Sequence, residues 1–283
     1  MGNEDAITDA FEERFEMIVQ ALQVKHPEIT LVGTAGPLPA GEDYQKGWNI
    51  VNRLKVPMID EHCYMPPDWF WENLGRWDHD DRNGAKVYLG EWAAHDQGRR
   101  STLRAALSEA AYFTSMERNG DVVVMASYAP LLARTQNTHW SPDLVYFNNT
   151  QVLPTLSYQV QKLLGNASGD RYLATNWPRT LGRFSASTVK NSRSGEIFVK
   201  LVHGDQRPIT IDIDIQGIPA GTTITQVDKT ELSGPDLDHV NTGVAGTPDE
   251  ILPVVETLQM TPPFQLELAP YSFTVLRLLT AQN

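Results

Sequence analysis

The chain has little cysteine, little basic charge and no long apolar run. Cys63 is the single cysteine in 283 residues, which excludes an internal disulfide and a zinc site built from cysteines. Lys and Arg total 23 against 35 Asp and Glu, giving a net charge of −12, whereas nucleic acids and anionic membranes require clustered basic residues in a partner. No apolar run approaches the roughly 18 residues of a membrane span. Neither a nucleic acid nor a membrane is therefore expected as a partner.

The composition is otherwise that of an ordinary globular protein, with 41% hydrophobic and 20% charged residues, so a soluble protein is expected. Residues 1–5 contain no basic and apolar leader, and no signal peptide is expected in this chain. A cytoplasmic location, or export if a preceding segment carries a signal, is left open.

Residues 1 to about 165 alternate between helical and strand patterns. Apolar residues recur every three or four positions from residue 7 to residue 22 and predict a helix that ends near His26. Further helices are expected over 43–54, 101–119 and 155–164, and strands over 29–33, 56–64, 86–91 and 121–127. Strands that alternate with helices at this spacing indicate a parallel sheet with crossover helices.

The pattern changes after Gly165. Short segments of alternating hydrophobicity follow over 196–202, 209–213 and 272–278, separated by turns rich in Gly, Pro and Asp. This is typical of an antiparallel β-sandwich. We therefore expect one domain over residues 1–170 and a C-terminal β-sandwich over residues 171–283.

Two glutamates occupy positions where a (β/α)₈ barrel would hold catalytic carboxylates. Glu91 ends the apolar run 86–90, and Glu4 directly precedes the first helix. They are 87 residues apart, close to three βα units of a barrel that spends roughly 31 residues on each unit. Paired carboxylates at strand ends suit glycoside hydrolysis, one as acid/base and the other as nucleophile. The alternative for the first is a plain helix start, with Asn3 as the cap and Glu4 favoured by the helix dipole.

Polar residues also end the strand between the two glutamates, in Asp60-Glu61-His62-Cys63-Tyr64. His62 and Tyr64 share one face because side chains alternate along a strand. A tyrosine hydroxyl there could orient a nucleophilic carboxylate, and a histidine could bond a sugar hydroxyl. The alternative is that both are core residues with satisfied hydrogen bonds. Cys63 should point away from the site.

Four aromatic residues follow this strand and have two interpretations. They could form a platform that stacks on sugars, or they could belong to the core, which is the commoner role at helical spacing. These residues are Trp69, Phe70, Trp71 and Trp77. The sequence leaves both interpretations open.

Six stretches in unbroken order, from residue 2 to about 165, resemble the α-L-arabinofuranosidases of glycoside hydrolase family 51. They are residues 2–4, 60–66, 87–93, 107–112, 123–131 and 140–150. The most specific of them contains Met-Ala-Ser-Tyr-Ala-Pro-Leu over 125–131. The C-terminal β region suits the sandwich domain of that family.

The resemblance implies a site and a reaction. Glu4 would be the general acid/base and Glu91 the nucleophile of a retaining glycosidase that releases terminal α-L-arabinofuranosyl groups from arabinoxylan- or arabinan-type saccharides. The substrate-binding residues would be Asn3, which bonds the hydroxyl beside the anomeric carbon, together with His62, Tyr64 and Trp92. Trp92 stands where the family usually has tyrosine. No metal and no organic cofactor is implied.

The resemblance also implies a partial fold. The chain matches the second half of the (β/α)₈ barrel, from the end of the fourth strand to the eighth, followed by the β-sandwich. Half a barrel leaves open strand edges that invite association. The alternative function is therefore a truncated, inactive fragment or a non-catalytic carbohydrate binder. Such a chain would self-associate or require a complementing N-terminal half.

Overall fold

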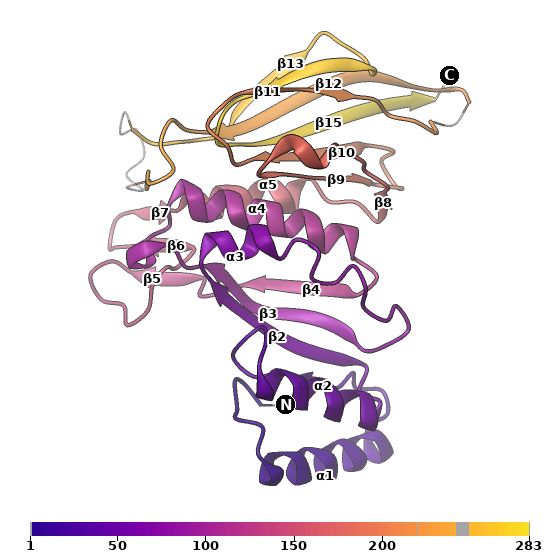
Figure 1. Cartoon of the computed structure of the whole chain (residues 1–283), viewed down its shortest axis with the longest axis vertical. Coiled ribbons are helices and arrows are strands. Elements are labelled where there is room, and N and C mark those ends of the chain that lie inside the picture. Colours follow the sequence, from indigo (N-terminus) through magenta and orange to yellow (C-terminus); the bar gives the residue numbers. More distant parts are fainter. Residues whose placement is uncertain (1, 219, 242–248, 283) are drawn as a thin grey trace. The chain divides into compact units, whose positions relative to one another are not determined.

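The computed structural model describes residues 2–218, 220–241 and 249–282 (Figure 1). By their contacts the residues form two compact units, one of Met1–Met65, Arg76–Ala93 and Asn119–Ala129, the other of Pro66–Gly75, Ala94–Arg118 and Pro130–Asn283. The division at residue 170 stays a prediction. Within the described ranges, no helix combines the length and the hydrophobicity needed to cross a bilayer.

The first unit is built on a four-stranded sheet with the strands in chain order, β1-β2-β3-β4. The strands are β1 (Val32–Thr34), β2 (Met58–Met65), β3 (Lys86–Ala94) and β4 (Val123–Tyr128). β1 pairs with β2 in parallel, and β3 pairs with β4 in parallel. Helix α1 (Asp9–Lys25) precedes β1 in the chain, and helix α2 (Glu42–Leu54) lies between β1 and β2. The parallel pairing expected from the alternating pattern is therefore present, while the partial barrel stays a prediction.

Local sequence fixes the two helices of this unit. The Thr8 hydroxyl accepts a hydrogen bond from the Phe11 backbone N–H at 3.2 Å and caps α1, so one of the free N–H groups of the first turn is satisfied. Gly47 lets α2 approach the end of β1, because a Cβ there would lie 2.3 Å from the Thr34 carbonyl oxygen. The first strand is shorter and later than expected, Val32–Thr34 instead of 29–33.

The described residues of the second unit include helices α3 (Pro67–Glu72), α4 (Leu103–Arg118) and α5 (Leu156–Asn166) and a pair of sheets that form a sandwich. The six-stranded sheet has the order β13-β12-β15-β10-β9-β8, and β11 pairs with β14 alone. In chain order these strands are β8 (Arg171–Leu173), β9 (Phe184–Lys190), β10 (Ile197–His203), β11 (Ile209–Ile213), β12 (Thr222–Ser233), β13 (Val254–Leu258), β14 (Phe264–Leu268) and β15 (Ser272–Gln282). The neighbouring strands of both sheets pair in antiparallel fashion, as expected for a C-terminal β-sandwich.

Both faces of the six-stranded sheet are covered. On one face α4 packs against β9, β10 and β15, and α5 packs against α4 (Figure 1), in a cluster that includes Leu107, Val160 and Phe198. On the other face β11 and β14 close a second cluster around Leu201 and Leu276. All seven residues of β10 are buried as a result.

The stretch between residues 132 and 154, for which no strand is expected from the sequence, contains a small sheet. β5 (Leu132–Arg134), β6 (Val145–Phe147) and β7 (Val152–Pro154) form three short strands in the order β5-β6-β7. β5 pairs with β6 in parallel, and β6 pairs with β7 in antiparallel fashion. Strands of three residues carry too little alternation for their pattern to be recognised in a sequence.

Two of the four aromatic residues left open above belong to the core. Phe70 is 0% and Trp77 is 1% exposed. Phe70 and Trp69 pack around Tyr112 of α4, with ring centroids 4.9 and 5.9 Å from the tyrosine ring. Phe70 and Trp77 therefore cannot present a face to a sugar without repacking.

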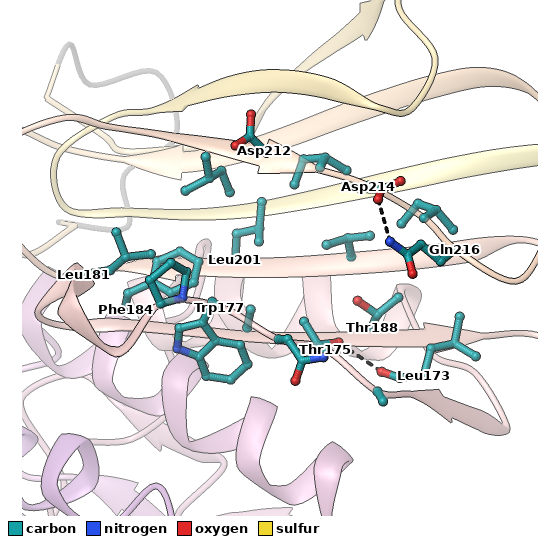
Figure 2. Close-up of a pocket in the computed structure, with 18 of the residues that line it drawn as sticks. Leu173, Thr175, Trp177, Leu181, Phe184, Thr188, Leu201, Asp212, Asp214 and Gln216 are labelled. Atoms are coloured by element: carbon teal, nitrogen blue, oxygen red, sulfur yellow. Dashed lines mark hydrogen bonds between the residues drawn. The ribbon is translucent and has the colours of Figure 1, made fainter.

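A cavity of about 480 Å³ opens in the sandwich of the second unit (Figure 2). Its walls include Phe184 and Leu201 from the large sheet and Ile213 from β11, all members of the second core cluster. Two carboxylates lie at its margin, where Asp212 accepts a hydrogen bond from Gln265 at 3.1 Å and Asp214 one from Gln216 at 2.8 Å. The cavity is thus an opening in an apolar core and is unlike a hydrolytic site.

Candidate active site

β2 separates two sets of polar side chains by the alternation of its faces. Glu61 and Cys63 lie on one face, and each is 1% exposed. His62 and Tyr64 lie on the other face, as the sequence predicts. Burial of the Cys63 thiol raises its pKa above the usual range, so this residue has the chemistry of a packing residue.

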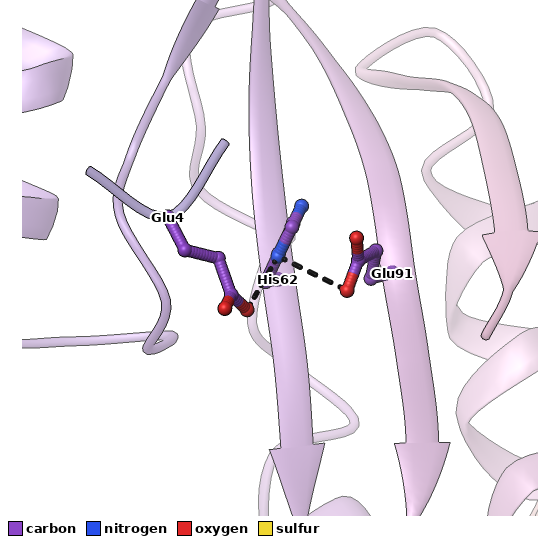
Figure 3. A group of neighbouring side chains, drawn as sticks. All are labelled: Glu4, His62 and Glu91. Carbon is purple, nitrogen blue, oxygen red and sulfur yellow. Dashed lines mark hydrogen bonds and ion pairs between the residues drawn. The ribbon is translucent and has the colours of Figure 1, made fainter. Parts of the chain in front are cut away.

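The face that carries His62 meets both predicted catalytic glutamates (Figure 3). His62 Nδ1 lies 2.8 Å from Glu4 Oε1 and 3.6 Å from Glu91 Oε2. One atom from each of these three side chains lies within 4.8 Å of the other two. The Tyr64 hydroxyl donates a hydrogen bond to Glu91 Oε2 at 2.8 Å. Four of the six predicted site residues are therefore in one group.

A carboxylate outside the predicted set completes the surroundings of His62. Asp60 Oδ2 lies 3.2 Å from His62 Nε2, and Asp60 Oδ1 accepts a hydrogen bond from the Gly90 backbone N–H at 3.1 Å. Asp60 and His62 share a face of β2 by the same period of two that links His62 with Tyr64. The same spacing in the sequence could have predicted Asp60 as a further site residue.

The carboxylates change the acid–base behaviour of their neighbours. Burial alone would lower the pKa of His62, but hydrogen bonds to Asp60 and Glu4 and the charges of Asp60 and Glu91 raise it to about 9. The pKa of Tyr64 is raised by burial, by its hydrogen bond to Glu91 and by the charges of Glu91 and Glu4. These shifts favour the protonated forms of both His62 and Tyr64.

The segment before α1 positions Glu4 beside His62. Glu4 has a backbone φ of 51°, in the left-handed region that residues other than glycine rarely adopt. Asn3 is exposed, and its backbone N–H donates to Asp5 Oδ2 at 2.9 Å. Because Thr8 caps the helix, the alternative that Asn3 is the helix cap is wrong.

Trp92 is placed differently from the other predicted site residues. Its side chain is 1% exposed, and its ring packs edge to face on Tyr128 with centroids 6.0 Å apart. The structure does not bring Trp92 into the group around His62. A contact of Trp92 with substrate rests on the family resemblance alone.

The opposite face of β2 is held by a buried ion pair. Glu61 Oε1 accepts hydrogen bonds from the Tyr44 hydroxyl at 2.6 Å and from Trp48 Nε1 at 3.0 Å. Glu61 Oε2 lies 3.2 Å from Arg76 Nη2, and Arg76 also donates to the Pro39 carbonyl at 2.7 Å. This network ties α2 and two loops to β2, and so it fixes the strand that carries His62 and Tyr64.

The donor atoms of Glu4, His62 and Glu91 are close enough for a metal ion to be considered. A metal ion would require the lone pair of His62 Nδ1, whereas hydrogen bonds to the carboxylates require that nitrogen to carry its proton. The arrangement fits hydrogen bonding better than metal coordination. The absence of a metal and of a cofactor stays a prediction.

Comparison with known proteins places the chain in a family. Residues 79–272 match the family model of the α-L-arabinofuranosidase C-terminal domain, and residues 1–82 match that of the α-L-arabinofuranosidase 1 domain. An extracellular exo-α-L-arabinofuranosidase of Streptomyces chartreusis is 44% identical over 185 residues, which cover 64% of this chain. The α-L-arabinofuranosidase 2 of Arabidopsis thaliana is 26% identical over 298 residues, which cover 99% of this chain.

Solved structures agree with these relatives. The arabinose-bound α-L-arabinofuranosidase MgGH51 is 28% identical, with a TM-score of 0.86 over 99% of this chain and 44% of its own. The α-L-arabinofuranosidase of Thermotoga maritima, in complex with arabinose, has a TM-score of 0.76 at 15% identity over 100% of this chain and 65% of its own, a likeness of fold.

The matches cover only part of the curated relatives. The chain spans 22% of the length of the Streptomyces protein and 40% of the length of the Arabidopsis protein. The C-terminal-domain model alone covers more than half of this chain. The chain therefore belongs to the α-L-arabinofuranosidases of glycoside hydrolase family 51 and corresponds to their C-terminal part.

Proposed function

We propose that this chain carries the catalytic pair of a retaining glycoside hydrolase that releases terminal α-L-arabinofuranosyl groups. The observation that carries the proposal is the meeting of Glu4 and Glu91 on either side of His62, with one oxygen of each within 4.8 Å of the other. Retaining glycosidases hold their two carboxyl groups about 5 to 5.5 Å apart, whereas inverting enzymes need about 6.5 to 9.5 Å to admit a water. The short separation favours retention.

Each side chain of the group has a role in the proposed double displacement. Glu91 attacks the anomeric carbon and forms a glycosyl ester while Glu4 delivers a proton to the departing oxygen. Glu4 then takes a proton from the water that hydrolyses the ester. The hydroxyl of Tyr64 holds Glu91 Oε2 in place, which limits the rotamers of the nucleophile before attack. Asn3, beside Glu4, is proposed to bond the neighbouring sugar hydroxyl.

The proposed substrates are arabinoxylan- or arabinan-type saccharides. The relatives named above are α-L-arabinofuranosidases, and two of the similar structures are arabinose complexes. These names support an arabinofuranosyl group as the sugar that is released. The polymer that carries it is inferred from the family.

We also infer that the first unit, with its parallel pairings in chain order, represents part of a (β/α)₈ barrel. The order β1-β2-β3-β4 is what consecutive barrel strands would show. Glu91, His62 and Tyr64 then lie toward the carboxyl ends of their strands, where barrel enzymes hold their active sites. A barrel part over residues 1–170 and a sandwich over 171–283 remain the proposed domains.

The two carboxylate roles can be separated by azide. With an aryl α-L-arabinofuranoside, Glu91→Gly should lose hydrolysis, and azide should then yield the arabinofuranosyl azide of inverted configuration, because azide takes the place of the nucleophile. Glu4→Ala should still form the ester with a good leaving group, and azide should yield the azide of retained configuration. Glu13→Ala, an exposed glutamate of α1, serves as the control and should hydrolyse like the parent chain.

Two results would contradict the assignment. Hydrolysis by Glu91→Gly at the parent rate would remove Glu91 from the reaction, and an inverted product from the parent chain would exclude the retaining mechanism. Absence of hydrolysis by the parent chain would favour the alternative of an inactive fragment or a carbohydrate binder. Light scattering in the same buffer tests the predicted self-association independently.

A further inference from the structure

We propose that Asp60 is a positioning residue that keeps both ring nitrogens of His62 protonated, so that a cation stands between Glu4 and Glu91. The part of this proposal that concerns catalysis rests on the function proposed above. The charge of His62 itself can be tested whether or not the chain hydrolyses a glycoside.

With Glu4 and Asp60 ionised, the geometry of the imidazole demands two protons. His62 Nε2 faces Asp60 Oδ2 at 3.2 Å, and Nδ1 faces Glu4 Oε1 at 2.8 Å. Ionised carboxylates only accept hydrogen bonds, and a neutral imidazole can donate from one nitrogen alone. When Glu4 and Asp60 are both ionised, as in the step in which Glu4 takes a proton from water, both contacts are satisfied together only by the imidazolium form. Since His62 is 2% exposed, water has little opportunity to replace either contact.

Asp60 is fixed from a second direction, by the strand that carries Glu91. Its Oδ1 accepts a hydrogen bond from the Gly90 backbone N–H at 3.1 Å. A Cβ on Gly90 would lie 2.1 Å from the same oxygen, so only glycine leaves room for this carboxylate. Asp60 therefore connects the two strands. One carboxylate oxygen accepts from the N–H of Gly90, the residue before Glu91, and the other faces His62 Nε2.

The charges around the ring explain what the cation does. The titratable groups facing His62 are Glu4 on the N-terminal segment, Asp60 and Tyr64 on β2, and Glu91 on β3. With His62 neutral, three carboxylates would lie close together and repel one another. A positive charge at Nδ1 offsets the repulsion between Glu4 and Glu91. The pKa of His62, raised to about 9, agrees with this arrangement.

Asp60→Asn tests the proposal because it changes charge with little change in shape. The Asn carbonyl can still accept from the Gly90 N–H, and its amide group then donates to His62 Nε2. That nitrogen must present a lone pair, so His62 becomes neutral while Nδ1 keeps its proton toward Glu4. The hydrogen-bonded geometry is preserved and the cation is lost.

The measurement is a pH titration of the full chain with ¹⁵N-labelled histidine, followed by long-range ¹H–¹⁵N correlation. His62→Gln identifies the His62 signals. In the parent chain both His62 nitrogens should show protonated shifts until the pH nears 9. In Asp60→Asn the midpoint should fall to about 7 or below, toward the ordinary histidine value. Asp212→Asn, an exposed carboxylate of β11, should leave the midpoint unchanged.

Gly90→Ala provides a second route to the same loss. The added methyl group displaces the Asp60 carboxylate without removing it, and the His62 midpoint should again fall. A parent His62 that is neutral at pH 7, or a midpoint unmoved by both variants, would overturn the proposal. If the chain hydrolyses a glycoside, Asp60→Asn should also move the alkaline limb of kcat/KM to higher pH, because that limb follows ionisation of the acid Glu4 and the variant removes the positive charge that favours this ionisation. A charged His62 without hydrolysis would leave this inference standing and refute only the proposed function.

Discussion

Replacing Glu61 by glutamine should destabilise the first unit by about 3 kcal/mol. The side chain is 1% exposed, and its two oxygens accept from Tyr44, Trp48 and Arg76. A carboxamide has one accepting oxygen, so its NH₂ group must face either the aromatic donors or the guanidinium. In both orientations the charge that balances Arg76 is lost.

The size of the expected stability loss follows from the contacts that Arg76 keeps. Breaking a buried ion pair by removing one member costs about 3 to 5 kcal/mol. Arg76 keeps its hydrogen bond to the Pro39 carbonyl and its contact with the Tyr44 ring, whose centroid lies 5.1 Å from the guanidinium carbon. These contacts place the cost at the lower end of the range. The strand most affected is β2, which carries His62 and Tyr64.

Amide hydrogen exchange is the suitable assay, because a chain of two compact units need not unfold in a single transition. A loss of about 3 kcal/mol corresponds to a roughly 150-fold faster exchange of β2 amides that open with the unit. Glu13→Gln, on the exposed face of α1, should change exchange by less than about threefold. Equal protection of β2 in Glu61→Gln and in the parent chain would refute the view that this ion pair holds the strand.

Three further predictions concern the Tyr64 hydroxyl, the buried Lys200 and the dependence of stability on pH. Tyr64→Phe removes the hydrogen bond to Glu91 and should lower kcat/KM roughly 10- to 100-fold, whereas an unchanged rate would deny the tyrosine its orienting role. Lys200 is 0% exposed and pairs with Glu117, so Lys200→Met should destabilise the second unit by about 3 to 5 kcal/mol in urea unfolding, and the additional change Glu117→Leu should recover most of the loss. A result in which the double variant is no more stable than Lys200→Met would contradict this. Because the pKa of His62 is raised to about 9 in the fold, the stability that its proton contributes, on the order of 3 kcal/mol, should be complete below about pH 6.5 and lost as the pH rises toward 9. Parallel stability profiles for the parent chain and His62→Gln across that range would refute it.

The regular elements were predictable where the local signal was strong. The apolar period of α1 and the cap at Thr155, whose side chain accepts from the Tyr158 N–H at the start of α5, both appear in the sequence. The sequence places β1 three residues too early because Ile29 and Leu31 are apolar, whereas in the structure the Ile29 N–H closes a turn onto the His26 carbonyl. The apolar character of a segment does not reveal such a turn. α4 likewise begins after Thr102, whose hydroxyl accepts from the Ala105 N–H, rather than at Ser101.

The candidate site residues on β2 and β3 were predictable from the sequence, whereas the hydrogen bonds that connect them were less so. The period of two places His62 with Tyr64, and the end of an apolar run marks Glu91. The bond between Asp60 and the Gly90 N–H joins two strands whose residues lie 30 positions apart, and nothing local signals it. The buried position of Trp92 was also missed, because an aromatic residue beside a predicted catalytic carboxylate is as compatible with the core as with a sugar.

The two-sided burial of β10 has a consequence for how the chain can be divided. The cluster beneath α4 and α5 joins Leu156, Val160 and Leu164, before residue 170, to Val189, Phe198 and Phe273, after it. Severing the backbone near residue 170 would therefore leave two pieces with complementary apolar surfaces. Such pieces would stay bound to each other after proteolysis, and each alone would expose the interior of the second unit to water. The helices that precede the sandwich therefore cover apolar surface of its large sheet.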